Sequence, residues 1–409
     1  MSGPPVSGLT STEAPARNEP GASARRREDA GNRPANAERS EAMSQSGPVG
    51  AGIIGAGVIS DTYLENLTAF PDVRVLMVAD LDLSRAAAQA EKHGVPRSGS
   101  TAELLADPAI ELVINLTIPA AHVDIGLAAL DAGKHVWAEK PLALDRESGR
   151  KLLDSAAEKG LRVASAPDTV LGAGLQTARR AIDAGEIGEP RTALAIFQTP
   201  GPESWHPAPE FLFQTGGGPL LDMGPYYLTS LVQLLGPIRR VTGAGGRNRE
   251  TRVIGSGPRA GTEFPVTVPT TVTALIDFER GGSAQLVLSF DSALRRVLLE
   301  LTGTQGAAVL PDPNGFDGPT LLHPLGTTDL TELPAKGHKA SRGTGALELA
   351  RAIRAGVPER ASGEVAYHVL DTMLAIDESI TTSTPVNVES TVDIPPALPA
   401  DWNPYETTL

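Results

Sequence analysis

Residues 49–60 read VGAGIIGAGVIS, and this stretch decides the fold because an apolar run ends in two closely spaced glycines. The apolar run is typical of a buried strand, and residues 61–70 can begin a helix. In such a unit Gly55 permits a tight turn, and Gly57 lets the backbone approach a pyrophosphate at the start of the helix. Ser60, in place of a third glycine, is still small enough for the helix to pack on the strand. The stretch therefore predicts a dinucleotide-binding turn, with an ordinary tight connection as the alternative.

A second apolar strand is predicted over residues 74–79, and it ends at Asp80. This carboxylate follows the turn by about 20 residues, the spacing of an acid that accepts hydrogen bonds from ribose hydroxyls. It would repel a 2′-phosphate, so the sequence favours NAD over NADP, although Arg85 lies near enough to offer a phosphate partner. The turn residues expected to contact the cofactor are Gly55, Ala56, Gly57, Val58 and Ile59.

The alternation of helices and strands continues to a lysine. Residues 84–92 and 122–132 have helical composition, whereas 112–116 and 136–138 are strand-like. The last of these strands ends at Glu139-Lys140-Pro141, and ligands gather beyond the carboxyl ends of strands in open parallel sheets. Lys140 is thereby expected to meet a nicotinamide ring.

Thr117 and Pro119 follow the preceding predicted strand at its carboxyl end. Both are expected to line the cofactor groove, with a plain strand-to-helix turn as the alternative.

Composition excludes several classes of protein. The chain has 409 residues, 41% of them hydrophobic, enough for two domains with substantial cores. It has no cysteine, which rules out disulfides, thiolate metal sites and a cysteine nucleophile and fits a cytoplasmic protein. The net charge of -14 argues against nucleic-acid and anionic-membrane surfaces. The seven histidines are scattered without a metal-ligand spacing, so no metal site is expected.

Residues 1–48 contain no aromatic residue and are rich in Gly, Pro, Ser, Ala, Glu and Arg, which predicts a disordered tail. The triplet Arg25-Arg26-Arg27 precedes Glu28 and a polar stretch instead of an apolar segment, so an export signal is not expected. Met43 stands just before the first strand and is a candidate alternative translation start.

Seven segments together resemble the glucose-fructose oxidoreductase, inositol dehydrogenase and MocA family of oxidoreductases (Gfo/Idh/MocA). The resemblance covers most of the chain beyond the tail. It is carried by GIIGAGVIS (52–60), Asp80, TIPAAH (117–122), DAGKHVWAEKPLAL (131–144), GEIGEP (185–190), GGGPLLDMGPYY (216–227) and the helical region 346–376.

The resemblance implies an α/β protein with two domains. An N-terminal Rossmann NAD(P)-binding domain is expected over 49–166, and a substrate and oligomerisation domain with a large, mostly antiparallel open sheet over 167–390. A C-terminal tail is expected over 391–409. A homo-oligomer, dimer or tetramer, is also implied. Independently, four β-rich runs favour the second sheet, namely 192–198, 266–278, 283–290 and 297–302.

The resemblance also implies the catalytic residues. Lys140 would reach the reacting hydroxyl, and a motif of form Asp-x-x-x-His would supply its partner. Here that motif runs from Asp222 to Tyr226, so a tyrosine replaces the histidine, as in the glucose-fructose oxidoreductase and dihydrodiol dehydrogenase branch. A phenol is a poor base unless a cation stabilises its anion, and we expect Lys140 to lower the pKa of Tyr226. Asp222 would orient the substrate or Lys140, or else cap a helix. The matched motifs also imply cofactor contacts by His122, Glu139 and Lys140.

Three further residues stand in predicted loops. Trp205 and His206 open a proline-rich segment and suit stacking and hydrogen bonding to a sugar, with a loop anchored by its tryptophan as the alternative. Asp168 stands where related enzymes often carry asparagine. Substrate contacts are therefore expected from Trp205, His206, Asp222 and Tyr226.

The sequence predicts an NAD-dependent dehydrogenase or reductase acting on a secondary hydroxyl or keto group of a sugar, polyol or related cyclic alcohol. Two alternatives stay open. One is a redox-neutral glycosidase with tightly bound NAD that acts by transient oxidation and β-elimination. The other is a non-catalytic nucleotide-binding protein.

Overall fold

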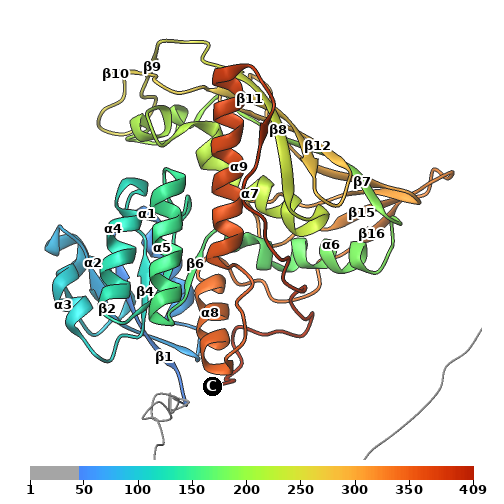
Figure 1. The fold of residues 1–409 in the computed structure, drawn as a ribbon. Helices are drawn as coiled ribbons and strands as arrows, with labels where there is room; N and C mark the ends of the chain where they lie inside the picture. The colour runs from blue at the N-terminus through green and yellow to red at the C-terminus, as the bar shows by residue number, and fades with distance from the viewer. Residues whose placement is uncertain (1–45) are drawn as a thin grey trace, which may run out of the picture. The chain divides into compact units, whose positions relative to one another are not determined.

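The computed structural model describes residues 46–409. The predicted disordered tail therefore lies outside the described residues apart from 46–48, and so does the candidate start at Met43. Figure 1 shows the order of the elements along the chain.

The first layer is a six-stranded parallel sheet in the order β3-β2-β1-β4-β5-β6. Its chain order reverses between β1 and β4, which pair side by side, and in such sheets this reversal opens a crevice at the carboxyl ends of the strands. The strands are β1 (Val49–Ile54), β2 (Val73–Ala79), β3 (Ser98–Gly99), β4 (Leu112–Asn115), β5 (His135–Ala138) and β6 (Val163–Ser165).

Helices connect these strands, and their ends follow from local sequence. Asp82 accepts the N–H groups of Ser84 and Arg85 at the start of α2, and Gly94 ends that helix in the left-handed conformation. The helices are α1 (Val58–Leu67), α2 (Leu83–His93), α3 (Thr101–Ala106), α4 (His122–Asp131) and α5 (Arg146–Lys159).

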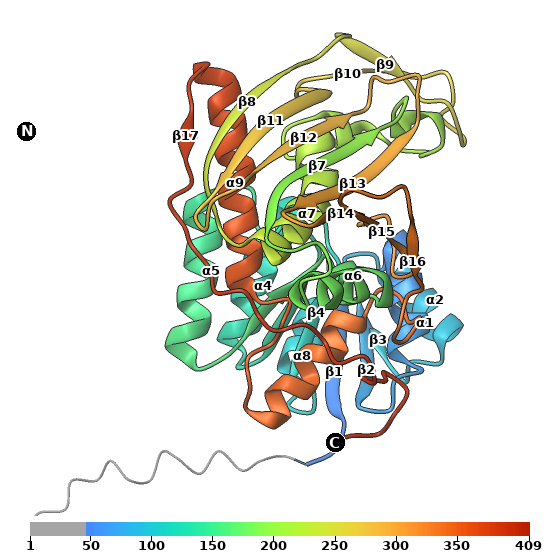
Figure 2. The same ribbon diagram turned by 90° about the vertical axis from the view of Figure 1, so that its right-hand side faces the viewer.

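The second layer is a nine-stranded sheet in the order β16-β15-β14-β13-β7-β12-β11-β8-β17 (Figure 2). All its strand pairs are antiparallel except β7 with β12. Its strands are β7 (Pro190–Gln198), β8 (Ile238–Gly246), β11 (Thr271–Phe278), β12 (Ser283–Ser289), β13 (Arg296–Gly303), β14 (Gly306–Val309), β15 (Thr320–Pro324), β16 (Thr331–Leu333) and β17 (Val386–Asn387). A separate hairpin pairs β9 (Thr251–Val253) with β10 (Glu263–Pro265).

Four further α-helices complete the fold. Helices α7 and α9 pack on each other and on strands of the large sheet, while α8 contacts α1, β5 and β6 of the first layer. The helices are α6 (Ala173–Asp183), α7 (Gly218–Leu235), α8 (Thr344–Ala355) and α9 (Gly363–Thr382). Within residues 46–409 no helix is both long and apolar enough to cross a membrane.

The predicted fold class is confirmed: a parallel Rossmann-like sheet precedes a large, mostly antiparallel one. Several boundaries differ from the sequence prediction. The run 266–278 begins as a strand only at Thr271, because Pro269 has no N–H for the ladder. The helical region 346–376 is two helices, separated by a break that begins at Gly356 in the left-handed conformation.

Residues 391–409, expected to be a tail, contain no helix or strand but pack back on the first layer. The N–H groups of Thr408 and Leu409 donate to the carboxylate of Asp72, which is fully buried. This segment is therefore part of the folded structure.

Candidate active site

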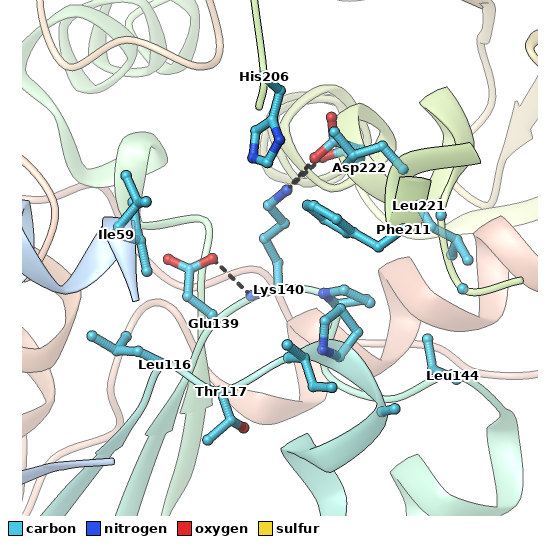
Figure 3. A pocket seen from close by; sticks show the side chains of 18 of the residues that line it. Ile59, Leu116, Thr117, Glu139, Lys140, Leu144, His206, Phe211, Leu221 and Asp222 are labelled. Carbon is cyan, nitrogen blue, oxygen red and sulfur yellow. Dashed lines mark hydrogen bonds and ion pairs between the residues drawn. The ribbon is translucent and has the colours of Figure 1, made fainter. Parts of the chain in front are cut away.

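A cavity of about 570 Å³ lies beyond the carboxyl ends of β1, β4 and β5 and is bounded on its other side by the loop that precedes α7, by α7 itself and by Arg342 (Figure 3). Of the predicted site residues it brings together Val58, Ile59, Thr117, Pro119, Glu139, Lys140, Trp205, His206, Asp222 and Tyr226. The sequence did not predict the other lining residues as site residues, namely Leu116, Ile118, Ala120, Pro141, Leu144, Phe211, Leu212, Thr215, Gly216, Gly217, Leu221 and Arg342.

The glycine turn lies next to this cavity, between β1 and α1. Gly55 has φ of +105°, and a Cβ there would come within 2.6 Å of the Leu116 carbonyl oxygen. Gly57 is different, because a Cβ added there would meet nothing within 4 Å. The first glycine is thus required by the fold, and the second leaves open space over the start of α1, where an anion finds free N–H groups.

Asp80 is joined to that turn at the end of β2. One carboxylate oxygen accepts the N–H of Ala56 at 2.7 Å, and the other accepts the N–H of Asp82 at 2.8 Å. A carboxylate has about four acceptor positions, so each oxygen keeps one for a ribose hydroxyl. Gly55, Ala56, Gly57 and Asp80 do not line the cavity itself but form the adjoining cradle.

Glu139 is fixed by hydrogen bonds at the cavity wall. Its carboxylate accepts the Tyr63 hydroxyl at 2.8 Å and the backbone N–H of Lys140 at 3.1 Å. The Tyr63 oxygen in turn accepts the indole N–H of Trp137 at 3.1 Å. Tyr63 and Trp137 are fully buried, so the loop that carries Lys140 is anchored to the core.

Lys140 forms an ion pair across the two layers. Its Nζ donates to the Asp222 carboxylate at 2.7 Å and to the Asp222 carbonyl at 2.9 Å (Figure 3). Burial alone would lower the pKa of Lys140, but the negative charges of Asp222, of Tyr226 once it is ionised, and of Glu139 raise it above its usual value. Lys140 is therefore a fixed cation, better suited to hold an oxygen atom than to accept a proton.

Tyr226, on α7, is 5% exposed and faces two cations. Its ring centroid is 5.2 Å from Lys140 Nζ and 5.6 Å from the Arg342 guanidinium carbon. Burial raises the pKa of Tyr226, and the attraction of both cations only partly opposes this rise. The expected lowering of the pKa by Lys140 is present as an attraction, but desolvation outweighs it.

The neighbouring Tyr227 lies in the core. It is fully buried, and its hydroxyl donates to the Ile196 carbonyl at 3.1 Å. Adjacent helical positions point in different directions, so only one of the two tyrosines faces the cavity.

Arg342 is a cavity residue that sequence reasoning missed. It stands just before α8, and Nη2 donates to Asn314 at 2.7 Å. Asp168, whose carboxylate accepts the N–H groups of Gly343 and Gly345, is fully buried beneath this helix start. Burial raises the pKa of Asp168 to about 6. No local motif marks Arg342. It reaches the cavity because the chain connection that follows β16 places it there, and such a connection has no short sequence pattern.

His122 does not line the cavity but is buried behind the loop that carries Lys140. It is 1% exposed, with Nδ1 2.8 Å from the Pro141 carbonyl and Nε2 3.0 Å from the Thr117 carbonyl. It thus ties the Lys140 loop to the end of β4. Its predicted role in touching the cofactor is not supported by this position.

Trp205 and His206 lie at the mouth of the cavity in the loop around the short helix η3 (Pro202–Ser204). Trp205 is 63% exposed, so it does not anchor the loop against the body. Glu203 does this instead, through an ion pair with the buried Arg252.

The residues present fit a dinucleotide. The open cradle at Gly57, the carboxylate of Asp80 and the cavity at Lys140 follow one another along the carboxyl edge of a parallel sheet. Within residues 46–409 no three histidine, aspartate or glutamate side chains are grouped as a metal site would require.

Comparisons with known proteins agree with this reading. Residues 49–166 match the model of the oxidoreductase family with an NAD-binding Rossmann fold, and residues 175–309 match the GFO/IDH/MocA C-terminal domain. The bovine (Bos taurus) trans-1,2-dihydrobenzene-1,2-diol dehydrogenase is 30% identical over 266 residues, 64% of this chain and 74% of that protein. The 1,5-anhydro-D-fructose reductase of Ensifer adhaerens is 27% identical over 270 residues, 63% of this chain and 74% of the reductase.

Solved structures show the same fold. A levoglucosan dehydrogenase complex with NADH superposes with a TM-score of 0.74 at 22% identity, covering 84% of this chain and 100% of the dehydrogenase. An NAD-binding oxidoreductase from Klebsiella pneumoniae gives a TM-score of 0.73 at 23% identity, covering 84% and 99%. Together with the glycine cradle and the Lys140 cavity, these matches show that the chain belongs to the Gfo/Idh/MocA family of NAD-binding oxidoreductases.

Proposed function

We propose that this protein is an NAD-dependent dehydrogenase or reductase that acts on a secondary hydroxyl or keto group of a cyclic, carbohydrate-like substrate. One observation carries the proposal: Lys140, Asp222 and Tyr226 meet in one cavity beside the glycine cradle. Bound NAD would supply the hydride acceptor, held by the turn residues 55–59, Asp80 and the cavity residues Thr117, Pro119 and Glu139.

Side chains of the protein would carry out the proton transfer. Lys140 would donate a hydrogen bond to the substrate oxygen and stabilise negative charge on it. Tyr226 would take the hydroxyl proton during oxidation and return it during reduction. Asp222 holds the Lys140 ammonium in place at 2.7 Å, which makes it a positioning residue for the lysine and a candidate for contact with the substrate.

The substrate class rests on the relatives and on the cavity lining. The curated relatives and solved structures are named for a dihydrobenzene diol, an anhydrofructose and levoglucosan. Trp205 and His206 at the mouth suit the apolar face and the hydroxyls of such a ring.

Substitution of Lys140 tests the proposal. Lys140→Met keeps the length of the side chain but removes the ammonium, so we expect turnover of an identified cyclic alcohol to fall below detection. NADH binding, measured by fluorescence titration, should stay measurable because the cradle is untouched. Lys151→Met, on the exposed side of α5, is the matched control and should behave like the parent enzyme. Retained turnover in Lys140→Met would refute the assigned role.

Assembly and location also belong to this proposal. We expect a dimer or tetramer, since Leu275 on β11 and Val297 on β13 leave apolar side chains 58% and 48% exposed on the large sheet. Sedimentation equilibrium of the purified chain would decide this, and a monomer at micromolar concentration would contradict it. A cytoplasmic location fits a chain without cysteine.

A further inference from the structure

Three aromatic rings form a ladder at the cavity mouth: Trp205, His206 and Phe211. The ring centroids of Trp205 and His206 are 5.5 Å apart, and those of His206 and Phe211 are also 5.5 Å apart. Both pairs meet edge to face, at 68° and 72°. All three residues line the cavity, yet Trp205 is 63% and Phe211 is 52% exposed. The ladder therefore continues from the reaction site to the surface.

The loop that carries the ladder is held from below by a buried arginine. Arg252 on β9 has a side chain only 2% exposed, and its guanidinium pairs with Glu203 on one side and Asp291 on the other. It also donates to the carbonyls of Pro200 at 3.0 Å and Phe290 at 3.1 Å. A second ion pair joins Arg259 of the same hairpin region to Glu210, next to Phe211. The exposed rings thus stand on a fixed support, which lowers the ordering cost of binding a ligand.

The middle ring offers a directed hydrogen bond. Nδ1 of His206 accepts the backbone N–H of Ala208 at 3.1 Å, which leaves Nε2 to carry the proton. Figure 3 shows the His206 ring above the Lys140–Asp222 pair. A donor in this place can reach a ligand oxygen that lies between the reacting ring and the outer rings of the ladder.

We propose that Trp205, His206 and Phe211 form a second subsite, which binds a second ring joined through an ether or glycosidic oxygen to the ring that is oxidised. Trp205 and Phe211 would stack on a flat ring face, either the C–H face of a sugar or an aryl group, and His206 would donate to the bridging oxygen. This inference rests on the proposed function of the cavity, but it concerns the size and shape of the substrate, not the chemistry.

Binding to the NADH-loaded enzyme tests the subsite without requiring turnover. The probes are matched one-ring and two-ring compounds: glucose with cellobiose, galactose with lactose, and methyl with phenyl β-glucoside. Isothermal calorimetry should show at least one two-ring probe binding about 10-fold more tightly than its one-ring counterpart, since a good aromatic contact contributes about that factor. Preference for the disaccharides or for the phenyl glucoside would tell a sugar ring from an aryl group.

Substitutions in the ladder show which residues cause the preference for two-ring probes. Trp205→Ala and Phe211→Ala should each weaken the binding of two-ring probes several-fold more than the binding of one-ring probes, and Trp205→Phe should retain most of the two-ring preference. Leu325→Ala, which trims another exposed apolar residue, is the matched control. The assignment is wrong if no two-ring probe binds more tightly than its counterpart, or if Trp205→Ala weakens one-ring and two-ring probes equally. Failure of the proposed function would look different, because NADH formation would then be absent whatever the binding pattern.

Discussion

Tyr226 and Tyr227 are adjacent tyrosines with different surroundings, and this makes them a matched pair. Tyr226→Phe removes the hydroxyl of a tyrosine that lines the cavity, so we expect kcat to fall about 100-fold or more, as for loss of a general acid or base. Tyr227→Phe removes a buried hydrogen bond to Ile196 and should cost about 1 kcal/mol of unfolding free energy, with kcat nearly unchanged. Steady-state kinetics and urea unfolding of both variants give the comparison. Equal kinetic losses would remove Tyr226 from the mechanism.

The pH dependence follows from the raised pKa of Tyr226. Its pKa lies above its usual value of 10.0 because burial outweighs the attraction of Lys140 and Arg342. Oxidation needs the deprotonated phenol, so kcat/KM for an alcohol should rise with pH without a plateau below pH 10. Reduction needs the protonated phenol and should be nearly flat over the same range. A plateau in oxidation near neutral pH would show that another group accepts the proton.

The sequence predicted only those catalytic residues that stand in recognisable motifs. Lys140, Asp222 and Tyr226 could be predicted because each stands in a short pattern with a known spacing. Arg342 could not, since a lone arginine before a helix has no local signature and only the tertiary fold brings it to Tyr226. The net direction of the Tyr226 pKa also escaped prediction, because burial of a side chain is set by packing and not by spacing.

The two glycines of the turn between β1 and α1 have different roles. We expect Gly55 to matter for folding and Gly57 for cofactor binding. Gly55→Ala would force a Cβ to within 2.6 Å of the Leu116 carbonyl at φ of +105°, so we expect a loss of about 1 to 3 kcal/mol of unfolding free energy. Gly57→Ala meets nothing within 4 Å and should fold like the parent protein. Its added methyl group stands in the cradle, however, and we expect NADH to bind at least several-fold more weakly. Thermal unfolding with and without NADH measures both effects, and unchanged NADH affinity in Gly57→Ala would place the pyrophosphate elsewhere.

The presence of a helix or a strand was easier to predict than the residues at which it begins and ends. Strands β1, β2, β4 and β5 and helices α1, α2 and α4 were predicted from apolar or helical patterns, with ends shifted by a few residues. The shorter strands β3 and β6 and the helices α3 and α5 were not predicted. The start of β11 was misplaced because the apolar run extends through Pro269, which cannot donate to the sheet. Helix α8 follows β16 of the second sheet in sequence but packs on the first sheet, which no local pattern reveals.

The C-terminal segment is joined to the first layer through Asp72, which lies just before β2. This buried carboxylate accepts bonds from Arg351 at 2.8 Å and from the Thr408 hydroxyl at 2.7 Å. Burial would raise the pKa of Asp72, but its bonds to Thr408 and Arg351 lower it below the usual value of 3.8. Asp72→Asn leaves Arg351 without its ion pair, so we expect a loss of about 3 kcal/mol of unfolding free energy at neutral pH.

The sign of the pH effect is fixed by the direction of that shift. Because the folded pKa of Asp72 is depressed, its stabilisation is present above the unfolded value of 3.8 and is lost as pH falls through the folded pKa. The difference between parent and Asp72→Asn in denaturant unfolding should therefore shrink in acid. Glu189→Gln, which breaks an exposed pair with Arg191, is the control and should cost less than about 1 kcal/mol. A similar cost for both variants would contradict a structural role of the C-terminal segment.

The most direct test of the account is to follow a labelled hydrogen from substrate to cofactor. The purified enzyme would be incubated with NAD and with cyclic alcohols deuterated at the carbinol carbon, and the NADH formed would be examined by mass spectrometry. We predict that it carries the deuterium, that the alcohol becomes a ketone, and that Lys140→Met and Tyr226→Phe abolish or sharply slow the transfer. Cleavage of a glycoside without net NADH, or NADH without deuterium, would contradict the central claim.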